Sequence, residues 1–165
     1  MGGGGRNRAS SEITVFLIAG NRLLRDGMAR LLKKDEGIRL VGASPSTGLA
    51  WQEVAASRSK VVLAECTTLR DSPALFHDLT ANVPESLLVI FGIYEDLDLF
   101  LRLVSLRVSG YALSDASADK LIGLVREVAQ GEMVPAQVLE PLDAESLGSH
   151  TAVHAIPGGN LFSES

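Results

Sequence analysis

The sequence predicts an α/β protein with a doubly wound parallel sheet of the flavodoxin-like type, (βα)5 with strand order 2-1-3-4-5. Two observations support this prediction. Short aliphatic runs alternate with amphipathic stretches along residues 13–130, and no Gly-rich dinucleotide-binding fingerprint lies between them. Such alternation is typical of parallel strands joined by right-handed helical crossovers. Without the fingerprint, the flavodoxin-like order is favoured over the other common order of such sheets.

Five aliphatic runs have the length and composition of buried strands, at residues 13–18, 38–43, 60–65, 87–91 and 110–113. Apolar runs of about four to eight residues suit strands that are covered on both faces. The third run ends abruptly on Glu65, and we interpret the following Cys66, Thr67 and Thr68 as a loop. Binding and active sites of such sheets lie at the carboxyl ends of the strands, so Glu65 is at a candidate functional position.

Helices are expected after these runs, at about residues 21–34, 46–56, 71–81, 96–107 and 118–130. Asn21 and Ser117 are favourable N-cap residues, and Gly131 has the usual place of glycine after a helix end. Apolar residues at helical spacing predict that Leu75, Phe76 and Leu79 of the third helix face the sheet, and that the last helix turns Leu121, Leu124, Val125 and Val128 inward.

Length and composition indicate one domain with tails. The net charge of -5 and the pI near 5.2 argue against a general nucleic-acid or membrane surface. A single cysteine excludes an internal disulfide and a cysteine-based zinc site, and it fits a cytoplasmic location. We expect a flexible N-terminus at 1–11, a domain at 12–134, and a linker or disordered tail at 135–165.

The predicted strand order places the first, third and fourth strands side by side. Their carboxyl ends then bring Ala19, Gly20, Glu65 and Gly92 to one rim of the sheet.

Three stretches carry a resemblance to a known family: ITVFLIAGNRLLRDGMARLL, VVLAECTTL, and residues 87–134, in which Tyr94 and Tyr111 are seventeen positions apart. Together they resemble the receiver domain of response regulators, most of all those of NarL/LuxR-type transcription regulators. The resemblance covers residues 13 to about 134.

In that family an aspartate ending the third strand accepts a phosphoryl group. Two acids after the first strand hold Mg²⁺, a Ser or Thr after the fourth strand binds the phosphoryl group, and a Lys after the fifth strand neutralises it. This arrangement follows the general logic of phosphoryl transfer, in which cations and donors stabilise the transferring oxygens.

The sequence departs from this pattern at every one of those positions. The acidic pair corresponds to Ala19 and Gly20, the acceptor to Glu65, the switch hydroxyl to Gly92 and the lysine to Ser114, while Tyr111 retains the family's rotating aromatic residue. The longer side chain of Glu65 would displace its carboxylate by more than ~1 Å, enough to cost about 100-fold in rate. We therefore predict a phosphorylation-independent pseudo-receiver with no catalytic residue, no metal and no cofactor.

Glu65 is open to several interpretations. It is either a built-in mimic of the phosphorylated aspartate or a partly exposed acid at a strand end, with Lys60 and Arg70 nearby in sequence. The small residues Ala19, Gly20 and Gly92 also leave room at the rim for a small molecule or a peptide, which Glu65 would anchor. A working receiver that uses Glu65, and an unrelated flavodoxin-like enzyme, are the remaining alternatives.

The expected helix 96–107 has two apolar stripes. The first follows the spacing of a sheet-facing stripe and consists of Leu97, Phe100, Leu101, Val104 and Val108. The second consists of Leu99, Leu103 and Leu106 and lies on another side of the helix. A surface helix that is apolar nearly all round is normally covered. We predict that a homodimer covers this stripe; the alternative is that neighbouring loops or the C-terminal tail do so.

These observations favour a non-catalytic regulatory and dimerisation module of a bacterial transcription regulator. Its helix-turn-helix output domain would lie outside this chain, so this segment itself is not expected to bind DNA or a membrane. A small-molecule or peptide sensor is the alternative.

Overall fold

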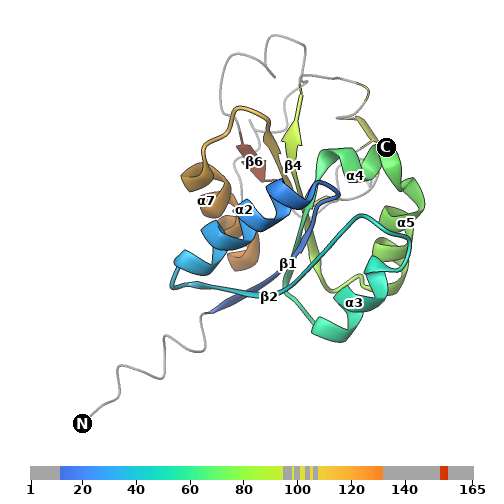
Figure 1. The fold of residues 1–165 in the computed structure, drawn as a ribbon, viewed down its shortest axis with the longest axis horizontal. Coiled ribbons are helices and arrows are strands. Elements are labelled where there is room, and N and C mark those ends of the chain that lie inside the picture. The colour runs from blue at the N-terminus through green and yellow to red at the C-terminus, as the bar shows by residue number, and fades with distance from the viewer. Residues whose placement is uncertain are drawn as a thin grey trace.

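The computed structural model of the protein describes residues 12–94, 98, 101–102, 105, 108–131 and 153–155. Six strands form one sheet in the order β2-β1-β3-β4-β5-β6 (Figure 1). The strands are β1 (Ile13–Ile18), β2 (Ile38–Ser44), β3 (Val61–Glu65), β4 (Leu87–Ile93), β5 (Gly110–Leu113) and β6 (Val153–Ala155). β1 to β5 pair in parallel, which confirms the predicted order 2-1-3-4-5.

β6 is an addition that the sequence did not predict. It pairs antiparallel with β5, so that His154 lies opposite Tyr111 at the edge of the sheet. The strand lies inside the stretch 135–165, for which we expected a linker or tail. Three residues are too short for an alternating pattern to be recognised, and only their pairing with β5 identifies them as a strand.

The helices flank the sheet on both faces. They are α2 (Arg22–Lys34), α3 (Ala50–Ser57), α4 (Cys66–Asp71), α5 (Pro73–Asn82) and α7 (Ala118–Gln130). α2 and α7 cover one face, whereas α3 and α5 cover the other (Figure 1). Among the described residues, no helix is long and apolar enough to cross a membrane.

The core is divided into two layers by the sheet. Val15 and Leu17 of β1 pack toward α2 and α7, whereas Phe16 and Ile18 pack toward α3 and α5, because successive side chains of a strand point to opposite faces. All residues of β3 are buried. Burial of one large aliphatic side chain contributes about 1.5–3 kcal/mol, so β3 is strongly fixed in the centre of the sheet.

Both predicted helix N-caps are present. The Oδ1 atom of Asn21 accepts a hydrogen bond from the Leu24 amide at 3.0 Å, and the Oγ atom of Ser117 accepts one from the Lys120 amide at 3.2 Å. Such caps contribute about 1 kcal/mol each. α7 ends at Gly131, whose φ of 66° lies in the left-handed region that glycine adopts readily.

The loop predicted after Glu65 was wrong. α4 begins directly at Cys66, and both Cys66 and Thr68 are buried. Buried backbone groups need hydrogen-bond partners, and a helical turn provides them locally. α4 is therefore an additional helix, and the predicted third helix is α5, which Pro73 begins at a position that needs no N–H donor. The inward-facing residues of α5 were correctly predicted: Leu75, Phe76 and Leu79 are all buried.

The described residues of the predicted helix 96–107 are helical. Val108 is buried as predicted, but Leu101 is 53% exposed although its spacing predicted that it faces the sheet. Helical periodicity fixes the positions of residues relative to one another, and not the rotation of the helix against the sheet. The remaining stripe residues lie outside the described part of the chain, including the predicted interface residues Leu99, Leu103 and Leu106.

Replacing Gly42 tests the packing of β2 on the core. A Cβ atom at Gly42 would lie 2.5 Å from Cε2 of the buried Phe16 ring. Gly42→Ala is therefore expected to lower the free energy of unfolding by about 1–3 kcal/mol, measured by urea denaturation.

Gly123→Ala in α7 is the matched control, because a Cβ atom there meets nothing within 4 Å. It is expected to raise stability by about 0.5–1 kcal/mol, since alanine favours a helix over glycine. Equal stability of the two variants would contradict the close contact between Gly42 and Phe16.

Candidate functional site

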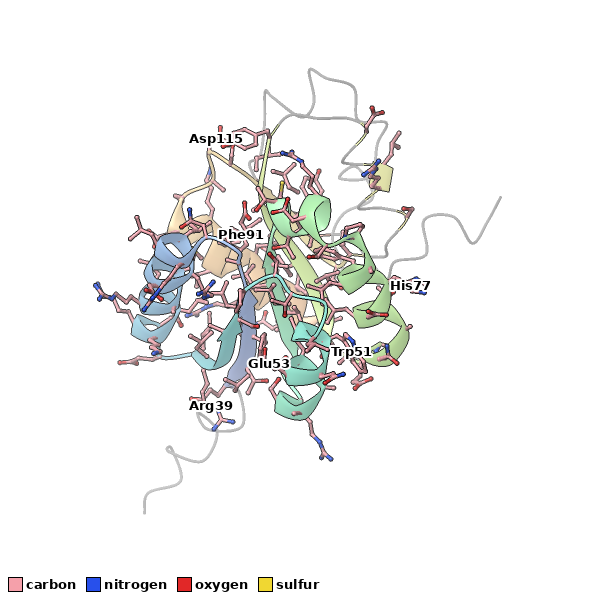
Figure 2. All side chains as sticks on the ribbon, turned by 45° about the vertical axis from the view of Figure 1, so that its right-hand side comes forward. Arg39, Trp51, Glu53, His77, Phe91 and Asp115 are labelled. Carbon is pink, nitrogen blue, oxygen red and sulfur yellow. The ribbon has the colours of Figure 1, made fainter. Side chains whose placement is uncertain are left out.

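The carboxyl ends of β1, β3 and β4 form the rim at which we expected the site. Phe91 and Asp115 lie toward this end of the sheet, and Arg39 lies toward the opposite end (Figure 2). Glu65 ends β3 opposite Phe91 of β4. A Cβ atom on Gly92 would lie 3.6 Å from the Oε1 atom of Glu65, so these two predicted site residues are neighbours.

The Glu65 carboxylate is buried, with 8% of the residue exposed, and is therefore not a partly exposed acid. Its Oε2 atom accepts a hydrogen bond from the Thr67 hydroxyl, which α4 positions two residues further along. In the described part of the chain no ion pair includes Glu65, although Lys60 and Arg70 are near in sequence. The carboxylate is thus held by a neutral donor.

Ala19 and Gly20 are the residues that replace the acidic pair, and a cation lies against their backbone. The Nη1 atom of Arg25 in α2 donates to the Ala19 carbonyl at 2.7 Å and approaches the Gly20 carbonyl at 3.5 Å. A divalent cation would need oxygen ligands here, preferably carboxylates, and it would be repelled by the guanidinium. The residues present do not fit a Mg²⁺ site.

Gly92 lies within β4, which continues to Ile93 instead of ending at residue 91 as predicted. Its φ of 78° is in the left-handed region, where a side chain costs about 1–2 kcal/mol. A switch hydroxyl at this position would therefore require the backbone to change. The sequence indicated that the switch hydroxyl is lost, but not that the backbone conformation at Gly92 disfavours a residue that would carry one.

Ser114 and Tyr111 occupy the remaining family positions. Ser114 is exposed, and its backbone N–H donates to the Ile93 carbonyl at 2.7 Å, which ties the end of β5 to β4. Its hydroxyl carries no charge with which to replace a lysine. Tyr111 is buried, and this burial raises the pKa of its phenol well above the usual range. The phenol therefore stays neutral near pH 7.

A cavity of about 440 Å³ opens beside Glu65. Glu65, Thr67, Gly92 and Ser114 contribute to its lining, together with apolar side chains that include Leu24 and Met28 of α2, Phe91 of β4 and Leu121 of α7. Ala19 and Gly20, which we expected in such a cavity, are not among its lining residues. The space at the rim therefore extends toward α2 and α7 instead of toward the end of β1.

No model of a known protein family matches the chain. Among curated proteins, the transcriptional regulatory protein DegU of Brevibacillus brevis is 25% identical over 122 residues, which cover 73% of this chain and 52% of DegU. The oxygen regulatory protein NreC of Staphylococcus haemolyticus is 23% identical over 120 residues, covering 72% of this chain and 55% of NreC. The chain spans about half the length of these curated relatives.

Solved structures match over most of the chain. The isolated receiver domain of RcsB from Salmonella enterica serovar Typhimurium superposes with a TM-score of 0.66 at 15% identity, covering 80% of this chain and 99% of that domain. The signal receiver domain of NarL from Mycobacterium tuberculosis gives a TM-score of 0.66 at 16% identity, with coverages of 74% and 99%. The chain has the fold of a response-regulator receiver domain. The resemblance recognised in the sequence is thereby confirmed.

Two features of this site escaped sequence reasoning. Arg25 was assigned only to a predicted helix, and nothing in its spacing indicated that it would reach back to the carbonyls of Ala19 and Gly20. Thr67 was assigned to a loop, whereas it is the donor that holds Glu65. A Thr two residues after a strand-ending acid was the available signal for the second feature, because hydroxyls commonly bond to neighbouring groups at the start of a helix.

The buried Tyr111 predicts an alkaline instability. The phenol in the unfolded chain has a pKa near ~10, whereas burial raises the pKa of Tyr111 in the folded domain. Above pH ~10 the unfolded state loses a proton that the folded state retains, so the free energy of unfolding falls as the pH rises.

The measurement is an alkaline titration of a Tyr94→Phe variant, in which Tyr111 is the remaining one of two tyrosines. Phenolate absorbance is expected to appear at the same pH as unfolding. The fluorescence of Trp51 reports the unfolding. The Tyr111→Phe variant is expected to lose less stability over the same pH range. Phenolate absorbance in the still-folded Tyr94→Phe variant would contradict the burial of Tyr111.

Proposed function

We propose that this receiver domain is a non-catalytic, phosphorylation-independent pseudo-receiver. The observation that carries the proposal is the Arg25 guanidinium on the carbonyls of Ala19 and Gly20. Phosphoryl transfer at this rim requires a divalent cation to neutralise the developing charge. This guanidinium, which forms no ion pair in the described part of the chain, opposes the binding of that cation.

Two further positions support the proposal. The positive φ of Gly92 disfavours a switch hydroxyl, and the neutral Ser114 stands in place of a lysine. Glu65 is one methylene longer than aspartate and already accepts the Thr67 hydroxyl. The loss of one of these family residues could be compensated. Here the metal ligands, the switch hydroxyl and the lysine, which together stabilise the transferring phosphoryl group, are all replaced.

We further propose that the domain is a cytoplasmic regulatory module of a bacterial LuxR-type transcription regulator. DegU is a transcriptional regulatory protein and NreC an oxygen regulatory protein, and the chain spans about half of each. RcsB, which shares the fold at 12% identity, was solved as dimers bound to DNA. A helix-turn-helix output domain outside this chain would supply the DNA contacts, since this acidic segment of net charge -5 is unsuited to them.

Homodimerisation through Leu99, Leu103 and Leu106 is proposed as the way in which the module acts. The exposed Leu101 supports an apolar surface on the same helix. The pairing of β6 with β5 supports the competing arrangement, in which the C-terminal segment of the chain covers this side itself. The oligomeric state distinguishes the two arrangements.

A small-molecule or peptide sensor is the second candidate function. It is favoured by the cavity of about 440 Å³ beside Glu65, which lies within the size range of small-molecule sites, about 300–1,000 Å³. In this candidate the ligand replaces the phosphoryl group as the signal at the rim.

The pseudo-receiver proposal predicts no response to Mg²⁺ and beryllofluoride, a phosphoryl mimic. Amide NMR resonances of Glu65, Gly92 and Tyr111 are expected to stay unshifted throughout the titration, because no metal site assembles beside Arg25. The receiver domain of RcsB, whose structure was solved in the presence of this mimic, is the positive control. Saturable shifts at the three residues would show a working phosphorylation switch and overturn the proposal.

The dimer proposal predicts that Leu103→Asp converts the protein to a monomer, because a charge buried in an apolar interface loses its hydration. Sedimentation velocity measures the change. Leu23→Asp on α2 is the control, since Leu23 is 83% exposed and lies on a different helix. A wild-type protein that is monomeric at high concentration would contradict the proposed interface.

A further inference from the structure

The cavity beside Glu65 combines a single negative charge with apolar walls. Glu65 is the one charged side chain among the described residues that line it. Leu24 and Met28 of α2 and Phe91 of β4 form part of the apolar wall. Tyr94 adds an aromatic side chain that is 68% exposed. A ligand that fills this space would meet a carboxylate at one point and hydrocarbon over most of its remaining surface.

The Glu65 carboxylate has no cationic partner in the described part of the chain. The ion pairs found there are Arg22–Asp26, Arg39–Glu12 and Arg126–Asp35. Arg25 of α2 donates to backbone carbonyls at the end of the neighbouring β1 instead. A buried carboxylate without a counter-charge is costly, because it gives up hydration without gaining an opposite charge. A cation that entered the cavity would supply the missing interaction.

The Thr67 hydroxyl engages one of the two oxygens of the Glu65 carboxylate, so the other is the candidate acceptor for such a cation. Thr67 donates to Oε2, whereas Oε1 faces Gly92, which has no side chain. The closest approach that a Cβ atom at Gly92 would make to Oε1 is 3.6 Å, so the glycine keeps space open beside that oxygen. An ammonium group forms short, charge-assisted hydrogen bonds with a carboxylate in such a position.

The surroundings fit an organic cation better than a metal ion. Within the described ranges of the chain, no group of three or more His, Cys, Asp or Glu side chains is placed to hold a metal. Hard divalent cations need about six oxygen ligands, and one carboxylate among apolar walls does not provide them. An alkyl or aryl ammonium instead buries its hydrocarbon part against those walls, and an aromatic ring such as that of Tyr94 attracts a cation.

We infer that this cavity binds a small organic ammonium or amidinium ligand, with its cationic group on Glu65 Oε1 and its apolar body between α2 and the start of α7. The inference rests on the sensor candidate and names the chemical class of its ligand. It is independent of the pseudo-receiver proposal, which the beryllofluoride titration tests separately.

The test is isothermal titration calorimetry of the full chain with 4-phenylbutylamine, 4-phenylbutanol and 4-phenylbutyrate, which share an apolar body and differ in charge. The amine is expected to bind at least tenfold more tightly than the alcohol, a difference of about 1.4 kcal/mol. Glu65→Gln is expected to remove this difference, because the amide keeps the size of the side chain but not its charge. Glu53→Gln, a matched change at an exposed position on α3, is expected to leave it intact.

Leu24→Ser provides a second variant with a different expected outcome. Leu24 is 37% exposed and lines the cavity, so its loss is expected to weaken the binding of the amine and of the alcohol to the same extent.

Retention of the tenfold difference in Glu65→Gln would overturn the assignment of Glu65 as the anchor. Equal binding of all three probes to the wild type would overturn the cationic class while leaving a ligand cavity. Binding of none of them would overturn this inference but not the sensor candidate, which also includes peptides and other classes of ligand.

Discussion

Complete burial of β3 between two helical layers is the constraint on which the rest of the structure depends. Its residues are covered on one face by α2 and α7 and on the other by α3 and α5. β1 and β4 pair on either side of it, so the positions of both are determined by its register. Because the last residue of this strand is Glu65, the same packing that stabilises the sheet also carries a carboxylate into a largely desolvated position at the rim.

At the rim, the charged side chains of Arg25 and Glu65 make separate contacts. The guanidinium of Arg25 is engaged by backbone carbonyls at the end of β1. The carboxylate of Glu65 is engaged by a neutral hydroxyl at the end of β3. Beside them lies a cavity that is apolar over most of its lining and carries one acidic side chain, and this is the space in which we propose that a ligand binds.

The edge of the sheet at β5 shows a second consequence of the fold. In a five-stranded receiver, β5 would be an edge strand with unpaired backbone groups, which favours pairing with another chain. Here β6 satisfies part of that edge by antiparallel pairing with Gly110, Tyr111 and Ala112. The contact also places the C-terminal segment opposite the buried Tyr111. Any association of two chains on this side must therefore accommodate β6 or displace it.

The sequence by itself determined the five parallel strands, the caps at Asn21 and Ser117, and the position of Glu65 at the rim. These depend on apolar periodicity and on capping residues, which are local properties of the chain. The same local signals missed the immediate start of α4, because a buried helical turn of polar residues has no apolar period to recognise.

Only the tertiary structure decided what surrounds the carboxylate. The reach of Arg25, the donor role of Thr67 and the apolar walls from α2 and α7 depend on how separate elements approach one another. The positive φ of Gly92 depends on how β4 passes Glu65. Residue spacing specifies which side chains share a face, whereas the distances between faces are set by packing across the whole domain. For this protein the fold was therefore predictable from sequence, and the chemistry of its rim required the assembled sheet.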